Sequence, residues 1–253
     1  LKLLSGQIGV SLENAKLYST LEERVIERTK TIELQKQEIE KAKQSSDKLL
    51  LNILPENIAD ELKVNGKCKP RRHDEVTIMF TDFKGFTMMS ESMSPEEIVE
   101  VVDHHYKKFD QIVKKYNVEK IKTIGDAYMC VSGLPEFNNQ HAENAILAAK
   151  EMLEFVDEYV ALRKEQQLPY CEMRVGIHTG PVVSGVVGSM KFAYDIWGVA
   201  VNTAARMEST SDPGKINISE STYNLVKDKF EFTYRGEVEA KHVGKLKMYY
   251  VEI

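Results

Sequence analysis

The pattern of apolar and polar positions changes near the end of the first fifty residues. Residues 13 to 50 contain no glycine or proline and are dense in Glu, Lys, Gln and Arg, which predicts a long exposed helix. A mostly apolar series at seven-residue spacing runs from Tyr18 to Ile53, with a second apolar series three residues on. This heptad pattern predicts a parallel dimeric coiled coil. Arg28 and Gln35 weaken it because they occupy positions where Leu is expected, and a single solvated helix is the alternative.

The rest of the chain alternates between strand-like and helix-like patterns. Ser94 caps one predicted helix and Pro95 occupies its first position. Pro55 interrupts an apolar stretch and indicates a hinge. Strands and helices that alternate around one sheet predict an α/β or α+β protein. The main predicted strands cover residues 76–80, 118–124, 127–132, 172–178, 231–237 and 246–252, and the main helices cover 95–116, 139–165 and 199–209.

Composition excludes some functions. The net charge of -5 argues against a nucleic-acid partner, which would favour a basic face. Three widely spaced cysteines, Cys68, Cys130 and Cys171, form neither a disulfide framework nor a zinc ligand set. No apolar run reaches the length of a membrane helix, so we expect no membrane segment in this fragment. These features predict a cytoplasmic location, and a tether in sequence upstream of Leu1 stays open.

Two aspartates are candidate metal ligands. Asp82 follows the apolar run VTIMF and precedes a turn that contains Gly85, while Asp126 lies in a tight turn between two predicted strands. Carboxylates bind hard cations, and backbone N–H groups of such turns can face phosphate oxygens. Two converging carboxylates could hold a metal pair for phosphoryl displacement. Taken singly, each is more often an ordinary turn aspartate.

Four extended motifs change that balance. They read FTDFKGFT, KTIGDAYM, RVGIHTGPVVSGVVG and YDIWGVAVNTAARME in chain order. In order, spacing and content they resemble the catalytic domain of class III adenylate and guanylate cyclases, over about residues 74 to 253. The segment LLNILPENIADELK resembles the transducer that precedes this domain in many members. The opening LSGQIGVSLENAKLYSTL resembles the final helix of a GAF sensor domain.

The resemblance implies an α+β fold with a ferredoxin-like βαββαβ core that forms a head-to-tail homodimer. It implies that a sensor domain in cis, upstream of this fragment, regulates the core through the coiled coil. The implied domains are the end of a GAF-like sensor (1–17), a coiled-coil signalling helix (18–49), a transducer and hinge (50–73) and the cyclase catalytic domain (74–253).

The resemblance also assigns the metal site. Asp82 and Asp126 are the positions that bind two divalent cations, Mg²⁺ or Mn²⁺, in this family, and Phe83 would lend its backbone carbonyl. The loop that would cover the substrate phosphates comprises Lys84, Gly85, Phe86 and Thr87.

The family's base readers fall on Lys122 and Asp195. Adenine offers an acceptor at N1 and a donor amino group at N6, whereas guanine reverses both. A lysine donates and an aspartate accepts, so the pair complements adenine and favours ATP. Guanylate-type members carry Glu at the first position and commonly Cys at the second.

The remaining implied residues act on the ribose and phosphates. Asn202 and Arg206 lie four apart on one helix face. The family pattern assigns Asn202 to orienting the ribose and Arg206 to the charge that builds on the α-phosphate, for which a permanently charged, forked guanidinium is suited. Lys241 matches the phosphate-binding lysine of a Lys-Gly-Lys-Gly loop, but here the loop reads KHVGK. Lys245 could replace the lost second charge.

The sequence therefore predicts an adenylate cyclase that converts ATP to 3′,5′-cyclic AMP and pyrophosphate at sites shared between two subunits. A guanylate cyclase is the enzymatic alternative. A catalytically silent dimerisation module is the other alternative, although such a module would be expected to lack a metal aspartate, the asparagine or the arginine.

Overall fold

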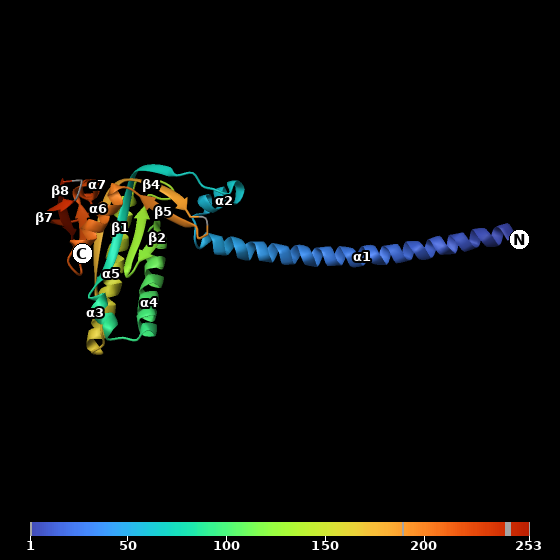
Figure 1. The fold of residues 1–253 in the computed structure, drawn as a ribbon, viewed down its shortest axis with the longest axis horizontal. Helices are drawn as coiled ribbons and strands as arrows, with labels where there is room; N and C mark the ends of the chain where they lie inside the picture. Colours follow the sequence, from blue (N-terminus) through green and yellow to red (C-terminus); the bar gives the residue numbers. More distant parts are fainter. Residues whose placement is uncertain (1, 189, 241–243, 253) are drawn as a thin grey trace. The chain divides into compact units, whose positions relative to one another are not determined.

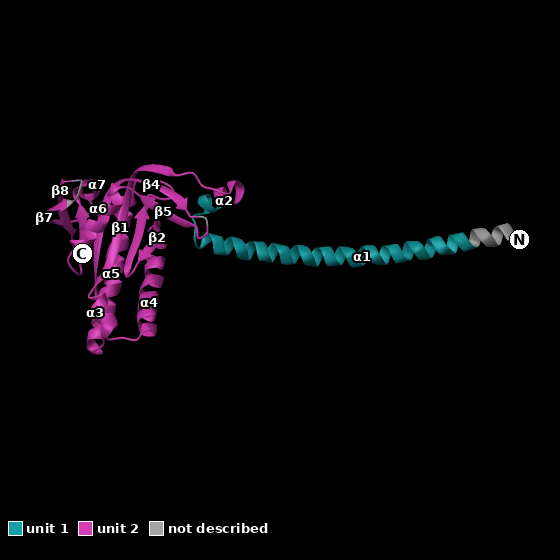
Figure 2. Ribbon diagram, in the orientation of Figure 1, with its two compact units in different colours: residues 1–59 teal, residues 60–253 magenta. Residues whose placement is uncertain are grey.

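The computed structural model describes residues 2–188, 190–240 and 244–252 and divides the chain into two compact units. Figure 2 colours these units, which comprise Leu1–Ala59 and Asp60–Ile253. The first unit is mainly one helix, α1 (Lys2–Leu51). Its heptad side chains are exposed in the single chain, with Ile32 63% accessible, so the coiled-coil pairing stays a prediction. None of the helices described is long and apolar enough to cross a membrane.

The second unit is built on one mixed sheet (Figure 1). The order of its strands is β2-β3-β1-β4-β6-β8-β7, and β5 pairs separately with β4. All described pairings are antiparallel except β4 with β6. The strands are β1 (Arg71–Lys84), β2 (Val118–Ile124), β3 (Ala127–Ser132), β4 (Glu172–Val187), β5 (Ala193–Trp197), β6 (Ile216–Ser219), β7 (Phe232–Ala240) and β8 (Gly244–Val251).

Helices connect the first four strands in the order expected for the α+β core. α4 lies between β1 and β2 in the chain, and α5 lies between β3 and β4, which gives the predicted βαββαβ arrangement. Ser94 caps α4 as predicted: its hydroxyl accepts from the Glu97 N–H, and the Glu97 carboxylate accepts from the Ser94 N–H. The helices are α2 (Glu56–Asn65), α3 (Phe86–Glu91), α4 (Pro95–Lys115), α5 (His141–Glu165), α6 (Val199–Ser209) and α7 (Glu220–Val226).

The alternation of side chains along β1 gives the sheet two buried faces. Met79 and Phe83 belong to a core that they share with α4 and α5. Ile78 and Phe80 belong to a second core, which contains Ala204 of α6. Side chains at even positions of β1 therefore point toward α6, and Asp82 is the next even position after Phe80.

Three local predictions were wrong. The strand predicted to end at Phe80 continues to Lys84, so Asp82 lies within a strand instead of after it. The strand predicted for residues 172–178 continues to Val187 as β4, and the second half of β4 pairs with β5. The predicted phosphate loop is the end of β1 followed by α3, and the two join at Gly85, whose φ of 86° is readily adopted by glycine.

Candidate active site

Asp82 lies in β1, and Asp126 lies in the turn directly before the adjacent strand β3. In the pairing of β1 with β3, Thr81 lies opposite Tyr128. The first residue of β3 is Ala127, which directly follows Asp126. The β2–β3 connection is a tight turn in which Gly125 has a φ of 63°, and it places Asp126 beside the end of β1. From the sequence alone, the two aspartates were expected to lie close together only if the turn brought Asp126 beside Asp82. The pairing of β1 with β3 places the turn at that position.

The electrostatics of the pair suit a cation. Burial raises the pKa of the Asp126 carboxyl, and the negative charge of Asp82 raises it further. Backbone N–H groups of Asp126 and Phe83, with the Arg174 guanidinium, lower that pKa. Two neighbouring carboxylates, of which that of Asp82 disfavours ionisation of the Asp126 carboxyl, are suitable hard oxygen ligands for Mg²⁺ or Mn²⁺. The described residues hold no cluster of three or more His, Cys, Asp or Glu groups around a metal position.

Arg174, which is not among the predicted site residues, is the direct cross-strand neighbour of Asp82. The two residues pair in the β1–β4 register, and the Arg174 Nη2 group donates to the Asp82 Oδ2 atom at 2.7 Å. The Arg174 Nη1 group donates to the backbone carbonyl of Ser209 at 3.2 Å. The Arg174 Nε atom also lies 2.6 Å from the Glu208 Oε1 atom.

Glu208 sits near the C-terminal end of α6 and is only 8% exposed. Burial raises the pKa of its carboxyl to about 7; the charge of Asp82 adds to the rise and Arg174 opposes it. Neither Arg174 Nε nor Glu208 Oε1 has a hydrogen-bond partner among the described residues, although the two atoms lie 2.6 Å apart. Their contact is therefore an ion pair with poor hydrogen-bond alignment. The Arg174 guanidinium thus contacts both the Asp82 carboxylate on β1 and the Glu208 carboxylate on α6.

The predicted base-reading pair is brought together by β2 and β5. The Lys122 ammonium donates to the Asp195 Oδ2 atom at 2.5 Å. The other carboxylate oxygen of Asp195 accepts from the Ile196 N–H at 2.9 Å, which fixes the orientation of the carboxylate. The side chain of Lys122 is 42% exposed and that of Asp195 15%, so the pair presents one donor and one acceptor at an accessible edge.

Asn202 and Arg206 lie on the exposed side of α6. Ala204 and Met207 on the same helix are buried against the sheet, which turns the two predicted residues outward. No hydrogen bond or ion pair joins the Asn202 amide or the Arg206 guanidinium to any side chain that the structure describes. Beside α6, Trp197 is 41% exposed and borders an apolar cavity of about 390 Å³ with Val183 and Val199.

The other predicted phosphate residues surround the end of β1. Lys84 is the exposed last residue of the strand, and Phe86 and Thr87 open α3. Lys84 and Gly85 border a surface cavity of about 640 Å³. The predicted contact from Lys241 lies outside the described residues, whereas Lys245 forms a 3.7 Å ion pair with Glu237 on β7.

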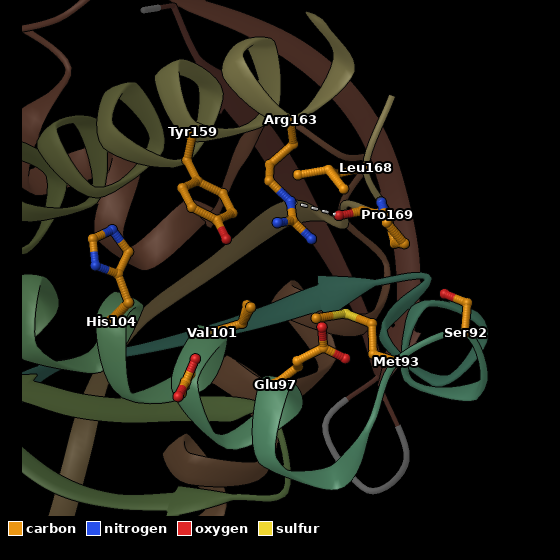
Figure 3. A pocket seen from close by; sticks show the side chains of 10 residues that line it. Ser92, Met93, Glu97, Val101, His104, Tyr159, Arg163, Leu168 and Pro169 are labelled. Carbon is orange, nitrogen blue, oxygen red and sulfur yellow. Dashed lines mark hydrogen bonds between the residues drawn. The ribbon is translucent and has the colours of Figure 1, made fainter. Parts of the chain in front are cut away.

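A separate cavity of about 570 Å³ lies between α4 and α5 (Figure 3). His104 and Glu97 line it from α4, and Tyr159 and Arg163 line it from α5. The Arg163 Nε group donates to the Pro169 carbonyl at 2.9 Å, which ties α5 to the loop that follows it. Neither of the aspartates predicted to bind metal nor the predicted base-reading pair borders this cavity.

Comparison with known proteins identifies the class that this fold and site define. Residues 68–253 match the model of the adenylate and guanylate cyclase catalytic domain, and the chain belongs to that family. An adenylate cyclase of Mycobacterium tuberculosis is 39% identical over 212 residues, covering 81% of this chain and 46% of the relative. A receptor-type guanylate cyclase of Caenorhabditis elegans is also 39% identical, over 238 residues, covering 92% of this chain and 21% of the relative.

A solved structure supports the same conclusion. The dimeric guanylyl cyclase domain of a fusion protein from the aquatic fungus Blastocladiella emersonii is 34% identical, with a TM-score of 0.65. The match covers 72% of this chain and 97% of that domain. The present chain spans less than half of the two full-length relatives, and their equal identity does not separate adenylate from guanylate specificity.

Proposed function

We propose that the chain is an adenylate cyclase unit that converts ATP to 3′,5′-cyclic AMP and pyrophosphate. The observation that carries the proposal is the 2.5 Å contact between Lys122 and Asp195. An ammonium can donate to adenine N1 and a carboxylate can accept from the N6 amino group, whereas guanine presents the opposite groups at both positions. The Ile196 N–H holds the Asp195 carboxylate in place, which preserves the acceptor when Lys122 turns to the base.

The proposed chemistry is an in-line displacement at the α-phosphate. The ribose 3′-OH gives its proton to a substrate phosphate oxygen as the 3′-oxygen forms a bond to the α-phosphorus; the bond from that phosphorus to the bridging oxygen breaks, and pyrophosphate leaves with the electron pair. When bound to Asp82 and Asp126, Mg²⁺ or Mn²⁺ supplies positive charge that lowers the pKa of the 3′-OH and offsets phosphate charge. Asn202 orients the ribose, and Arg206 stabilises the charge that develops on the α-phosphate.

The position of α6 supports a site shared between two subunits. Asn202 and Arg206 face outward from the same helix whose inner side holds Glu208 near Asp82. A second chain that binds head to tail would present these residues, its Lys122–Asp195 pair and Lys241 to the aspartates of the first. The proposed assembly is therefore a homodimer, in which α1 forms a coiled coil that transmits the state of an upstream sensor.

The test is to identify the product. Purified protein is incubated with ATP or GTP and with Mg²⁺ or Mn²⁺, and the cyclic nucleotide is measured by mass spectrometry. We expect cyclic AMP, with kcat/KM for ATP exceeding that for GTP at least about tenfold, because a matched polar pair contributes about 1–3 kcal/mol to base discrimination. Cyclic GMP as the main product would support a guanylate cyclase instead, and no product from either nucleotide would support a silent module.

Exchanging the base readers tests the residue assignment. Lys122→Glu combined with Asp195→Cys should shift the ratio of kcat/KM values at least about tenfold toward GTP, because donor and acceptor are removed together. Lys120→Glu is the matched control, since Lys120 lies on the same strand but pairs with Asp110. An unchanged preference for ATP in the double variant would contradict the proposed role of the pair.

A further inference from the structure

We propose that Glu208 is a positioning residue that sets how strongly Arg174 competes with a divalent cation for Asp82. The inference rests on the proposed function, because it takes Asp82 as a metal ligand. Asp82 carries one guanidinium as its ionic partner, and that same guanidinium also contacts Glu208. The buried glutamate therefore determines how the charge of Arg174 is divided between two carboxylates.

The sheet and α6 bring the three groups together. Asp82 and Arg174 are paired in register on adjacent strands and point to the same face, the face that α6 covers. The Arg174 Nη2 group contacts Asp82 at 2.7 Å, and the Nε group on the same edge of the guanidinium lies 2.6 Å from Glu208. The side chains of Asp82, Arg174 and Glu208 are 21%, 22% and 11% exposed, respectively. Water therefore screens these charges less than it would at the open surface.

The backbone holds Glu208 at this position. A Cβ atom at Gly176 would lie 1.8 Å from the Glu208 nitrogen, so only glycine lets β4 approach the end of α6 this closely. The buried Asn217 side-chain amide donates to the Met207 carbonyl at 2.8 Å and fixes the same turn of α6 to β6. Glu208 therefore belongs to the rigid sheet–helix junction, and Arg174 has a partner whose location does not depend on the metal.

The charge balance determines the direction of the effect. A divalent cation that binds the Asp82 Oδ2 atom competes with the Arg174 guanidinium for that oxygen. With Glu208 in place, the guanidinium keeps an anionic partner when it leaves Asp82. Without that carboxylate, metal binding would leave a partly buried cation unpaired next to a second cation, which is unfavourable. Loss of Glu208 should therefore weaken metal binding, whereas loss of the Arg174 charge should strengthen it.

The experiment measures Mn²⁺ affinity by electron paramagnetic resonance in the full chain, without nucleotide, at about pH 8, which is above the pKa of about 7 of the Glu208 carboxyl. We expect Glu208→Gln to raise the Kd about tenfold, the order of effect expected for one nearby unit charge. Glu208→Asp keeps the charge and should largely restore the affinity. Arg174→Met should lower the Kd. Glu151→Gln is the matched control, because Glu151 pairs with Lys115 between α4 and α5.

When Glu208→Gln folds, either of two outcomes overturns the inference. One is a Glu208→Gln variant that loses thermal stability but binds Mn²⁺ as the wild type does, because Glu208 would then only support α6. The other is wild-type Mn²⁺ binding that does not depend on Asp82. If Glu208→Gln fails to fold, an unchanged or raised Kd in Arg174→Met also overturns it. The cyclic-nucleotide assay separates this failure from failure of the proposed function, since product formation and Mn²⁺ affinity are measured independently.

Discussion

Asp82 and Asp126 carry the negative charge on which the proposed chemistry depends. The pKa of Asp126 is raised by burial and then by its neighbour, so replacing either carboxylate changes the charge of a partly buried site and removes a metal ligand. Asp82→Asn and Asp126→Asn should each reduce kcat at least about a hundredfold, the scale of loss when transition-state charge is no longer stabilised. Steady-state assays with saturating Mn²⁺ and ATP measure this.

The control for these variants is Asp228→Asn, which removes an exposed carboxylate between α7 and β7 and should leave kcat unchanged. Circular dichroism establishes that each variant is folded. A folded Asp82→Asn or Asp126→Asn variant that keeps more than about a tenth of the wild-type kcat would contradict the assignment of that residue as a metal ligand.

His178 is a different kind of residue, one that supports the fold. Its Nδ1 atom lies 2.7 Å from the Ser219 hydroxyl oxygen, and the residue is partly buried. Burial lowers the pKa of His178 to about 4. Because the folded-state pKa is below the unfolded value of about 6.5, the unfolded chain binds the proton more tightly. The folded protein should lose stability as the pH falls from about 6.5 to about 4.

Urea unfolding at a series of pH values tests this. The free energy of unfolding of the wild type should fall more steeply than that of His178→Gln over the same interval, because glutamine removes the titrating group. Above about pH 7 the two curves should run parallel. Equal slopes below pH 7 would show that other groups account for the acid sensitivity.

At the residue scale, the sequence identified groups that occur in recognisable motifs and missed groups defined by the register. Asp82, Asp126, Lys122 and Asp195 were assigned through a family resemblance, and the last two are 73 positions apart, a pairing that local patterns cannot reveal. Arg174 was missed although it carried a signal. It is a charged residue between the buried Met173 and Val175, and a charge inside an apolar strand generally requires a partner.

At the scale of elements, patterns predicted strongly periodic segments well and polar strand ends poorly. The helix predicted for residues 199–209 coincides with α6, and the capping box marks the start of α4. The end of β1 was misplaced because Asp82 breaks the apolar run. The strand continues there because its backbone pairs with β4 and its carboxylate pairs with Arg174, and both interactions depend on distant sequence. Tertiary pairing overrode the local signal.

The junction of β4 with α6 leads to a prediction at this scale. Gly176→Ala would place a methyl group on the Glu208 backbone, so α6 must shift away from the sheet. We expect the free energy of unfolding to fall by about 2 kcal/mol or more, as in overpacked cores, and turnover to fall with it because α6 carries Asn202 and Arg206. Urea unfolding and steady-state assays measure the two effects.

Gly185→Ala provides the comparison on the same strand. The nearest atom to its added Cβ is 3.6 Å away, on the Trp197 ring, which is ordinary packing contact. This variant should unfold within about 0.5 kcal/mol of the wild type. If the two alanine variants are equally stable, the close approach of β4 to α6 does not constrain the helix.

At the scale of the whole molecule, the family and the α+β core were predictable because several long motifs agreed in order and spacing, and the comparison over residues 68–253 confirms the family. Subunit pairing is less accessible to sequence reasoning. The exposed heptad side chains of α1 and the outward-facing Asn202 and Arg206 are features of one chain, and their partners lie on another chain in the proposed homodimer. Testing the proposed dimer therefore requires an experiment in which activity depends on residues from two different subunits.

Mixing two inactive variants provides that test. Asp82→Ala removes a metal ligand and Arg206→Ala removes the proposed phosphate contact, and each homodimer should be inactive. In a head-to-tail heterodimer one site contains both substitutions and the other contains neither. Random pairing makes about half of the dimers heterodimers, each with one of two sites intact, so activity should return to about a quarter of the wild-type value. If both residues served one site within a single chain, verified heterodimers would remain inactive, because no chain would contain a complete site.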